Sequence, residues 1–281
     1  MLKNFIKILL ILLIVSCQQE GVQFKNEIKP DKKYTKHLSI SSISEVNFIA
    51  DQEMLDLIES QGYKLPINTE IASEMTTEII TGDRVNNGEI ITAKNYRKMS
   101  SYTIVNGDKK IERSPYSGTK ILGKYDKHNR FLIDSIIGQR LTPQMRYFYT
   151  QTLVGLEKKI KFPQNIIKVG DSIENEMPLN IPIQGMDPVK AIIKINYILK
   201  KIKGNKAVFE IDQIVSLDPI WGQDNINLIG AGKGHSEYDI DENQLTKYTS
   251  EIPMELTIKI NEKMTAKIKI SMHHDQYVTI D

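Results

Sequence analysis

An intramolecular disulfide is excluded, because Cys17 is the only cysteine in the 281-residue sequence. Exported proteins commonly use disulfides, so a single cysteine in an exported chain needs another explanation. Tryptophan is equally scarce: Trp221 is the only one, and aromatic residues make up 7% of the chain. Few side chains are therefore available to stack on sugar rings, which weighs against a glycosidase that works with paired carboxylates.

An excess of either charge is also lacking. The 37 Lys and Arg residues nearly balance the 35 Asp and Glu residues, which gives a formal net charge of +2. A nucleic-acid-binding domain typically has a basic footprint. We therefore expect no nucleic-acid partner.

The spacings that mark common catalytic and nucleotide-binding sites are missing. There is no G-x-S-x-G motif and no Walker motif. The glycines of "GAGKGHS" (230–236) are followed by "EYDIDENQLTKY", a strand-and-turn pattern rather than the helix that a phosphate-binding loop needs. We expect these glycines to permit a bulge or a close backbone approach in a curved sheet. The protein is thus expected to be non-enzymatic and to bind no cofactor.

The sequence "MHHDQY" (272–277) is the one cluster that suggests a metal site. On a strand, His273 and Asp275 would share a face and His274 would point to the other. Two ligands are too few for zinc, which takes three or four. Nothing in the sequence brings the other three histidines close. We expect a polar turn here and no metal.

The N-terminus carries an apolar segment, Ile8–Val15, that is shorter than the roughly 20 residues needed to cross a bilayer as a helix. Lys3 and Lys7 precede it, as in a secretory signal. The segment runs into "IVSC" (14–17), which resembles the lipobox of bacterial lipoproteins. In that family the cysteine thiol receives a diacylglycerol and the preceding segment is removed. The resemblance implies a signal peptide over 1–16 and lipid attachment at Cys17.

Lipidation would anchor the protein, because each buried CH₂ contributes about 0.8 kcal/mol and two or three acyl chains hold firmly. By resemblance to the sorting rules of lipoproteins, Gln18 after the cysteine favours the outer membrane over retention in the inner membrane. Residues 18–36 are polar and lack periodicity. We therefore predict a lipidated flexible tether over 17–36 and a protein anchored in the outer membrane of a bacterial cell envelope, on either face.

Alternation with a period of two dominates the rest of the chain. It is clear in "VKAIIKINYILK" (189–200), in "AVFEIDQIVSL" (207–217) and on both sides of the turn at 261–263. One apolar and one polar face are typical of antiparallel sheets that are covered on one side. The sequence therefore predicts a mainly β fold.

Helical spacing occurs twice. The segment 51–61 is followed by Gly62, a residue typical of helix C-termini. The segment 143–157 follows Thr142 as N-cap and has Pro143 in its first turn. We expect the second helix to lie across the sheet and cover part of its apolar face.

A joint rich in Pro, Asn and Gly at 162–188 separates two halves of the chain. The stretches 122–136 and 235–252 each hold a Tyr-Asp pair, a polar turn with an Asn and an apolar residue that opens a new strand, which favours a weak internal repeat. The alternative is that two unrelated β-meanders look alike. We predict two curved antiparallel, half-barrel-like units, 37–160 and 161–281, with one or two short covering helices.

Together, the lipobox, the tether, "FP…IKVGDSI…MP" and "GAGKGHSEYDIDENQL" resemble a class of Bacteroidetes outer-membrane lipoproteins without an assigned function. The strands are similar to the half-barrels of the lipoprotein-localisation superfamily, in which one antiparallel sheet curls around a helix and often holds acyl chains. The resemblance implies a concave sheet that binds a lipid or another apolar ligand.

The alternative is a solid β-sandwich that serves as a protein–protein interaction or structural module in an outer-membrane assembly, with an envelope protein as partner. A continuous apolar cavity would favour the ligand-binding interpretation over this one.

Overall fold

The computed structural model describes residues 21–281 apart from 86, 115, 138–141, 145–146, 148–161, 163–164, 182, 184–187 and 221–223. Within these ranges the fold is mainly β, with one helix, α2 (Gln52–Ser60). The strands are β1 (Gly21–Val22), β2 (Lys33–Ile49), β3 (Ile67–Arg84), β4 (Ile90–Val105), β5 (Asp108–Arg113), β6 (Lys120–Tyr125), β7 (Phe131–Ile137), β8 (Ile167–Lys168), β9 (Ser172–Ile181), β10 (Val189–Lys203), β11 (Lys206–Leu217), β12 (Ile226–Asp239), β13 (Gln244–Asn261) and β14 (Met264–Ile280). The predicted fold class, a mainly β protein built on antiparallel sheet, is confirmed.

One large sheet holds twelve of the described strands. Its hydrogen-bonded order is β7-β6-β4-β3-β2-β14-β13-β12-β11-β10-β9, with β5 paired to β4. Neighbours along this path are antiparallel, and β1 and β8 form a separate two-stranded ribbon. The longest strands have 17 or 18 residues, a length of about 55–60 Å at 3.3 Å per residue.

The two predicted sheet units are joined into this single sheet by the pairing of β2 with β14. The register runs from Tyr34 opposite Ile280 to Ile49 opposite Thr265. The sequence did not indicate this pairing, because β2 is rich in serine and alternates weakly. In addition, a contact between strands near opposite ends of the chain leaves no local signal.

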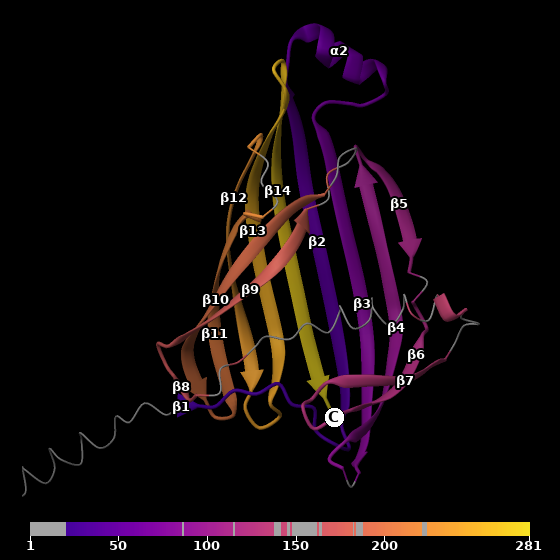
Figure 1. Cartoon of the computed structure of the whole chain (residues 1–281), viewed down its shortest axis with the longest axis vertical. Coiled ribbons are helices and arrows are strands. Elements are labelled where there is room, and N and C mark those ends of the chain that lie inside the picture. The colour runs from indigo at the N-terminus through magenta and orange to yellow at the C-terminus, as the bar shows by residue number, and fades with distance from the viewer. Residues whose placement is uncertain are drawn as a thin grey trace, which may run out of the picture.

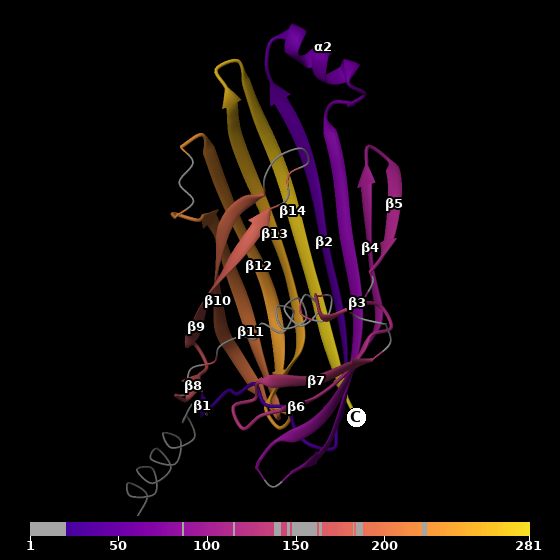
Figure 2. The ribbon, with the colours of Figure 1, turned by 45° about the vertical axis from the view of Figure 1, so that its right-hand side comes forward.

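The sheet is strongly curved. Figures 1 and 2 show β9 and β10 in front of the long strands at one end of the sheet and β6 and β7 in front of them at the other. Both ends therefore turn toward the same side, and the sheet encloses a concave face between them.

Glycines in β12 lie where the backbone of the neighbouring strand β13 comes close. A Cβ atom at Gly234 would lie 2.2 Å from the backbone oxygen of Thr249, and one at Gly232 would lie 2.5 Å from that of Glu251. The predicted reason for "GAGKGHS", a close backbone approach within a sheet, is confirmed. The following turn and strand are also as predicted, because β13 begins at Gln244.

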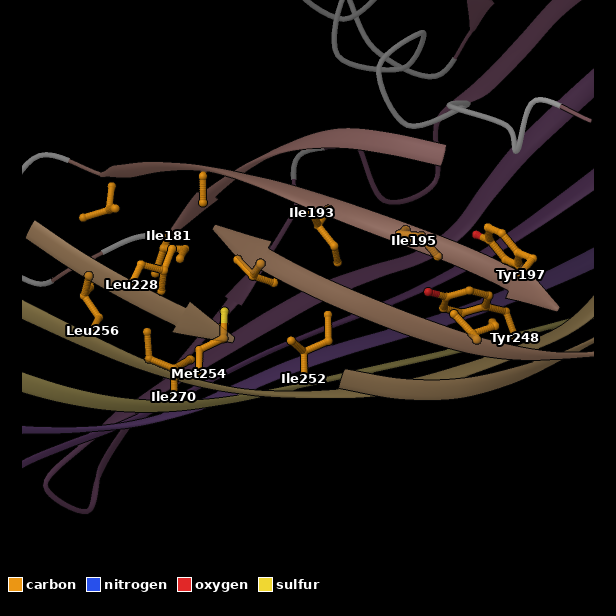
Figure 3. Close-up of a cluster of buried hydrophobic side chains, with 14 of the residues drawn as sticks. Ile181, Ile193, Ile195, Tyr197, Leu228, Tyr248, Ile252, Met254, Leu256 and Ile270 are labelled. Carbon is orange, nitrogen blue, oxygen red and sulfur yellow. The ribbon is translucent and has the colours of Figure 1, made fainter. Parts of the chain in front are cut away.

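The main core lies on the concave face of β9–β14, where this part of the sheet folds over on itself. Figure 3 shows Ile193 and Ile195 of β10 across from Ile252 and Met254 of β13. These four side chains are at most 6% exposed. The alternation predicted for 189–200 and 207–217 therefore places its apolar residues inward, in one large cluster of buried side chains.

The helices do not match the covering role that was predicted. The helix over 51–61 exists as α2, with Asp51 as N-cap and Gly62 directly after the C-cap Gln61. However, α2 has no buried residue and lies at one tip of the molecule (Figure 1), so it does not cover the apolar face of the sheet. The predicted helix 143–157 falls almost entirely outside the described residues.

The predicted tether over 17–36 is wrong for residues 21–36. Phe24 and Ile28 are only 2% and 4% exposed, and β2 already begins at Lys33. Phe24 packs edge-on against Phe209 and Tyr238, with ring centroids 5.1 and 5.0 Å apart. Phe24 and Ile28 are single apolar side chains that fill gaps at the end of the sheet, and they belong to no periodic pattern. The sequence therefore contained no sign that they are buried.

The two similar stretches, 122–136 and 235–252, form comparable turns. Asn129 and Asn243 both adopt positive φ, 58° and 53°. Both turns hold the same N-terminal segment: the Ile28 N–H donates to the Asn129 Oδ1 (3.3 Å), and the Glu27 N–H donates to the backbone oxygen of Asn243 (3.3 Å). Duplication itself stays a prediction.

Candidate functional site

A cavity of about 700 Å³ lies on the concave face. Its lining comes from β2, β3, β4, β6, β9, β10, β13 and β14, together with residues 26 and 28 of the N-terminal segment. Strands from both ends of the sheet therefore meet around one space, which we call the hollow. Apolar side chains, including Met75, Ile79 and Val278, form part of its wall.

Five tyrosines line the hollow and give it an aromatic wall; besides Tyr34 of β2, they are Tyr96, Tyr125, Tyr197 and Tyr248. All are at most 7% exposed. Burial raises the pKa of Tyr96 to about 12 and raises the pKa of the other four as well. The hydroxyls therefore stay neutral, and each ring offers an apolar body with a polar tip.

Lys36 points into this apolar space. On β2 it stands directly opposite Thr77 of β3 and Val278 of β14, and all three line the hollow. Burial lowers the pKa of Lys36, because the charged ammonium is less well solvated there than in water. Within the described part of the chain, no carboxylate forms an ion pair with this ammonium to offset the cost.

His274 is the second ionisable group in the hollow. Its ring centroid lies 4.7 Å from that of Tyr248, and its Nε2 atom is buried without a hydrogen-bond partner among the described residues. Burial, and after it the positive charge of Lys36, lowers the pKa of His274 to about 4, against a smaller opposite effect of Asp275. The imidazole is therefore neutral at pH 7.

Lys94 also lines the hollow but is held differently. The side chain is 1% exposed, and its ammonium lies 3.6 Å from the ring centroid of Phe131 and 4.9 Å from that of Tyr125. Aromatic faces attract cations, so these rings already stabilise the charge of Lys94.

Among the described residues that line the hollow, the acidic ones lie on β9, an edge strand. Glu174 and Glu176 are exposed, and Glu176 lies 3.9 Å from the ammonium of Lys194. These carboxylates are more accessible to water than Lys94, which is 1% exposed, and Lys36, which is half-buried.

The structure tests some of the predicted site residues and not others. Cys17 lies outside the described residues, so lipid attachment stays a prediction. The predicted turn at 272–277 is wrong, because these residues belong to β14. The predicted division of its side chains is right: His274 lines the hollow, whereas the flanking His273 and Asp275 occupy the opposite face of the strand. In the part of the chain that is described, no three His, Cys, Asp or Glu side chains are grouped to hold a metal ion.

Sequence reasoning missed the polar groups of the hollow, above all Lys36. The available signal was the alternation that places Tyr34, Lys36 and Leu38 on one face of β2. It could not be used without knowing that β2 is a central strand with one buried face.

Comparisons with known proteins give no family. No protein-family model matches the chain, and no curated protein matches it. A solved structure titled "lipid-protein interactions in lipovitellin" aligns over 91% of this chain with 10% identity and a TM-score of 0.40, and the chain spans about a quarter (26%) of its length. The translocator domain of the autotransporter NalP from Neisseria meningitidis aligns over 98% of this chain and 95% of its own, with 6% identity and a TM-score of 0.15. At these TM-scores neither similarity supports an argument.

No helix among the described residues is both long enough and apolar enough to cross a bilayer.

Proposed function

We propose that the protein is a non-enzymatic lipoprotein of the cell envelope, anchored through Cys17, which holds a lipid or another apolar ligand in the hollow. The observation that carries the proposal is the cavity of about 700 Å³ on the concave face. Pockets for small ligands typically measure 300–1,000 Å³ and have mostly apolar and aromatic walls with a few polar groups. The hollow agrees with this description in both size and lining.

The packing of the two parts of the sheet supports ligand binding over a purely structural role. The concave face of β9–β14 is filled by its own side chains, as a solid sandwich would be. The smaller buried clusters, around Met75 and around Tyr34, lie on the other part of the sheet. The hollow lies where residues of all three clusters meet, since Tyr197, Tyr96 and Tyr34 each line it. A module that needed only a stable core would gain from filling this space.

Binding can be tested on the full chain with Cys17→Ser, which removes the proposed site of lipid attachment. We expect a fluorescent fatty acid to bind with about 1:1 stoichiometry, and native mass spectrometry after exposure to a lipid extract to show a bound species. Failure to bind any acyl ligand by either method would refute the proposal.

A variant that fills the hollow makes the test specific. Met75→Trp adds volume at the lining, whereas Glu74→Trp places the same ring on the exposed face of the same strand. We expect Met75→Trp to weaken acyl binding at least tenfold and Glu74→Trp to leave it unchanged. Equal binding by both variants would show that the ligand sits elsewhere.

A further inference from the structure

We propose that Lys36 binds the anionic head group of the ligand, so that the hollow selects an anionic amphiphile, such as a fatty-acid carboxylate or an anionic lipid, over a neutral one. This inference rests on the proposed function, because it names the chemistry of the ligand in the same hollow. It is carried by the position of Lys36 and by the polar atoms around it.

The position of Lys36 is unusual for a lysine. Its neighbours on the concave face are Tyr34 and Leu38 along β2, with Thr77 and Val278 across from it. Lysine is rarely placed in such surroundings unless its charge is paired. Within the described part of the chain the charge has no acidic partner, and burial lowers the pKa of Lys36 accordingly. A bound anion would supply the missing partner and favour the charged form.

Two further polar groups in the hollow lack partners. The Oγ1 atom of Thr77, a residue that is 5% exposed, makes no hydrogen bond to the described residues, and neither does the Nε2 atom of His274. Buried polar atoms are almost always hydrogen-bonded, and an orphan often marks the place of a missing ligand or water. The Thr77 hydroxyl can donate to an anion held by Lys36, and so can the neutral imidazole of His274 in the tautomer protonated at Nε2.

The other charged groups of the hollow fit this role less well. Lys94 already lies over the rings of Phe131 and Tyr125. Glu174 and Glu176 would favour a cationic ligand, but they are exposed on the edge strand β9. Charges in water discriminate weakly between ligands, whereas a desolvated ammonium discriminates strongly. The half-buried, partly desolvated ammonium of Lys36 therefore decides which head group the hollow accepts.

The test compares ligands that differ only in the head group, using the full chain with Cys17→Ser. Palmitate, hexadecanol and hexadecylamine carry the same chain and are anionic, neutral and cationic at pH 7.5. We expect palmitate to bind about tenfold or more tightly than hexadecanol, since a hydrogen bond to a charged group contributes about 1.5–3 kcal/mol. Equal affinities, or a preference for hexadecylamine, would overturn the inference.

Two variants assign the preference to Lys36. Lys36→Met keeps the length of the side chain and removes its charge, and Lys269→Met removes one charge from the exposed face of β14. We expect the first to lower palmitate affinity to that of hexadecanol without changing hexadecanol binding, and the second to leave both unchanged. An unaltered palmitate preference in Lys36→Met overturns the inference. Should that variant not fold, the comparison of the three ligands on the parent chain still decides.

The outcomes separate the inference from the function on which it rests. If no C16 ligand binds, the proposed function fails. If all bind alike, the hollow is a lipid site without a role for Lys36. Competition between palmitate and vesicles of phosphatidylglycerol or phosphatidylcholine distinguishes the sources of the anion: displacement by phosphatidylglycerol alone indicates an anionic lipid head group, and no displacement indicates a free fatty acid.

Discussion

At the scale of single residues, the hollow is defined by groups that are costly to bury without a partner. Lys36, Thr77 and His274 each place a polar atom in a space whose walls are tyrosine rings and aliphatic side chains. Such groups lower the stability of the empty protein, because desolvation is not repaid by hydrogen bonds within the chain. Their presence is easiest to understand if a ligand supplies the partners.

His274 predicts a specific dependence of stability on pH. Its pKa is about 4 in the folded protein and 6.5 in the unfolded chain, so the unfolded state binds more protons between these values. The free energy of unfolding should therefore be unaffected by this group above pH 6.5 and fall as the pH drops toward 4, by up to about 3 kcal/mol. Urea unfolding at pH 7.5, 6.0 and 5.0 measures the loss.

The matched variant for this prediction is His274→Gln, which cannot gain a proton in this range. It should flatten the pH dependence between 6.5 and 5, whereas His273→Gln on the opposite face should keep it. Parallel curves for the parent and His274→Gln would show that the imidazole is not a buried neutral group.

Cys17 carries the second residue-scale prediction. If it is lipidated, Cys17→Ser should move the protein from the membrane fraction to the soluble fraction and abolish incorporation of a radiolabelled fatty acid, since about 0.8 kcal/mol is lost for each CH₂ that leaves the bilayer. The comparison strain expresses the unaltered chain. Continued co-sedimentation of Cys17→Ser with membranes would contradict a lipid anchor at this residue.

At the scale of elements, the secondary structure could be predicted correctly where local periodicity determines it. The strands β10, β11, β13 and β14 were predicted from alternation, because each has one buried and one exposed face. The glycines of β12 were also interpreted correctly, since the absence of a helix after them was visible in the sequence.

The elements that could not be predicted depend on contacts between residues that lie far apart in the sequence. Residues 21–32 are held by partners far away in the chain: Phe24 packs against Phe209 of β11 and Tyr238 of β12. The N–H of Ile28 donates to the turn residue Asn129. The hollow was expected only as some concave apolar face. Its polar residues stayed hidden, because no local pattern shows that Lys36, Thr77 and His274 lie on neighbouring strands.

A prediction at this scale concerns the close contact between β12 and β13. Gly234→Ala would place a Cβ atom 2.2 Å from the backbone oxygen of Thr249, so the strands must separate. We expect a loss of stability of about 1–3 kcal/mol, as is typical when a well-packed site is overfilled. Urea unfolding measures it.

The control for Gly234→Ala is Lys233→Ala, which alters the exposed face of the same strand. It should change the free energy of unfolding by no more than about 0.5 kcal/mol. A stable Gly234→Ala protein would mean that the glycines are not needed for the curvature of the sheet.

At the scale of the whole molecule, the order of the chain indicates how a lipid at Cys17 would orient the protein. Gly21 is described in β1, at the end of the sheet opposite α2 (Figure 2). Cys17 precedes Gly21 by four residues, which span at most about 14 Å. A lipid at Cys17 would therefore hold the end of the sheet with β1 and the turn 240–243 near the bilayer, and α2 would be the distal tip.

This arrangement gives the last prediction. A fluorophore on Asp241→Cys, in the turn that contacts the N-terminal segment through Lys29, should be quenched by spin-labelled lipid head groups, whereas one on Glu59→Cys in α2 should not. The expected contrast follows from the strand length of about 55–60 Å, which exceeds the reach of contact quenching several times over. If Cys17 is lipidated as proposed, its sulfur cannot react with the dye, and each variant carries one label. Equal quenching at both sites would mean that the sheet lies flat on the membrane, and quenching at Glu59→Cys alone would mean that it is anchored from the opposite end.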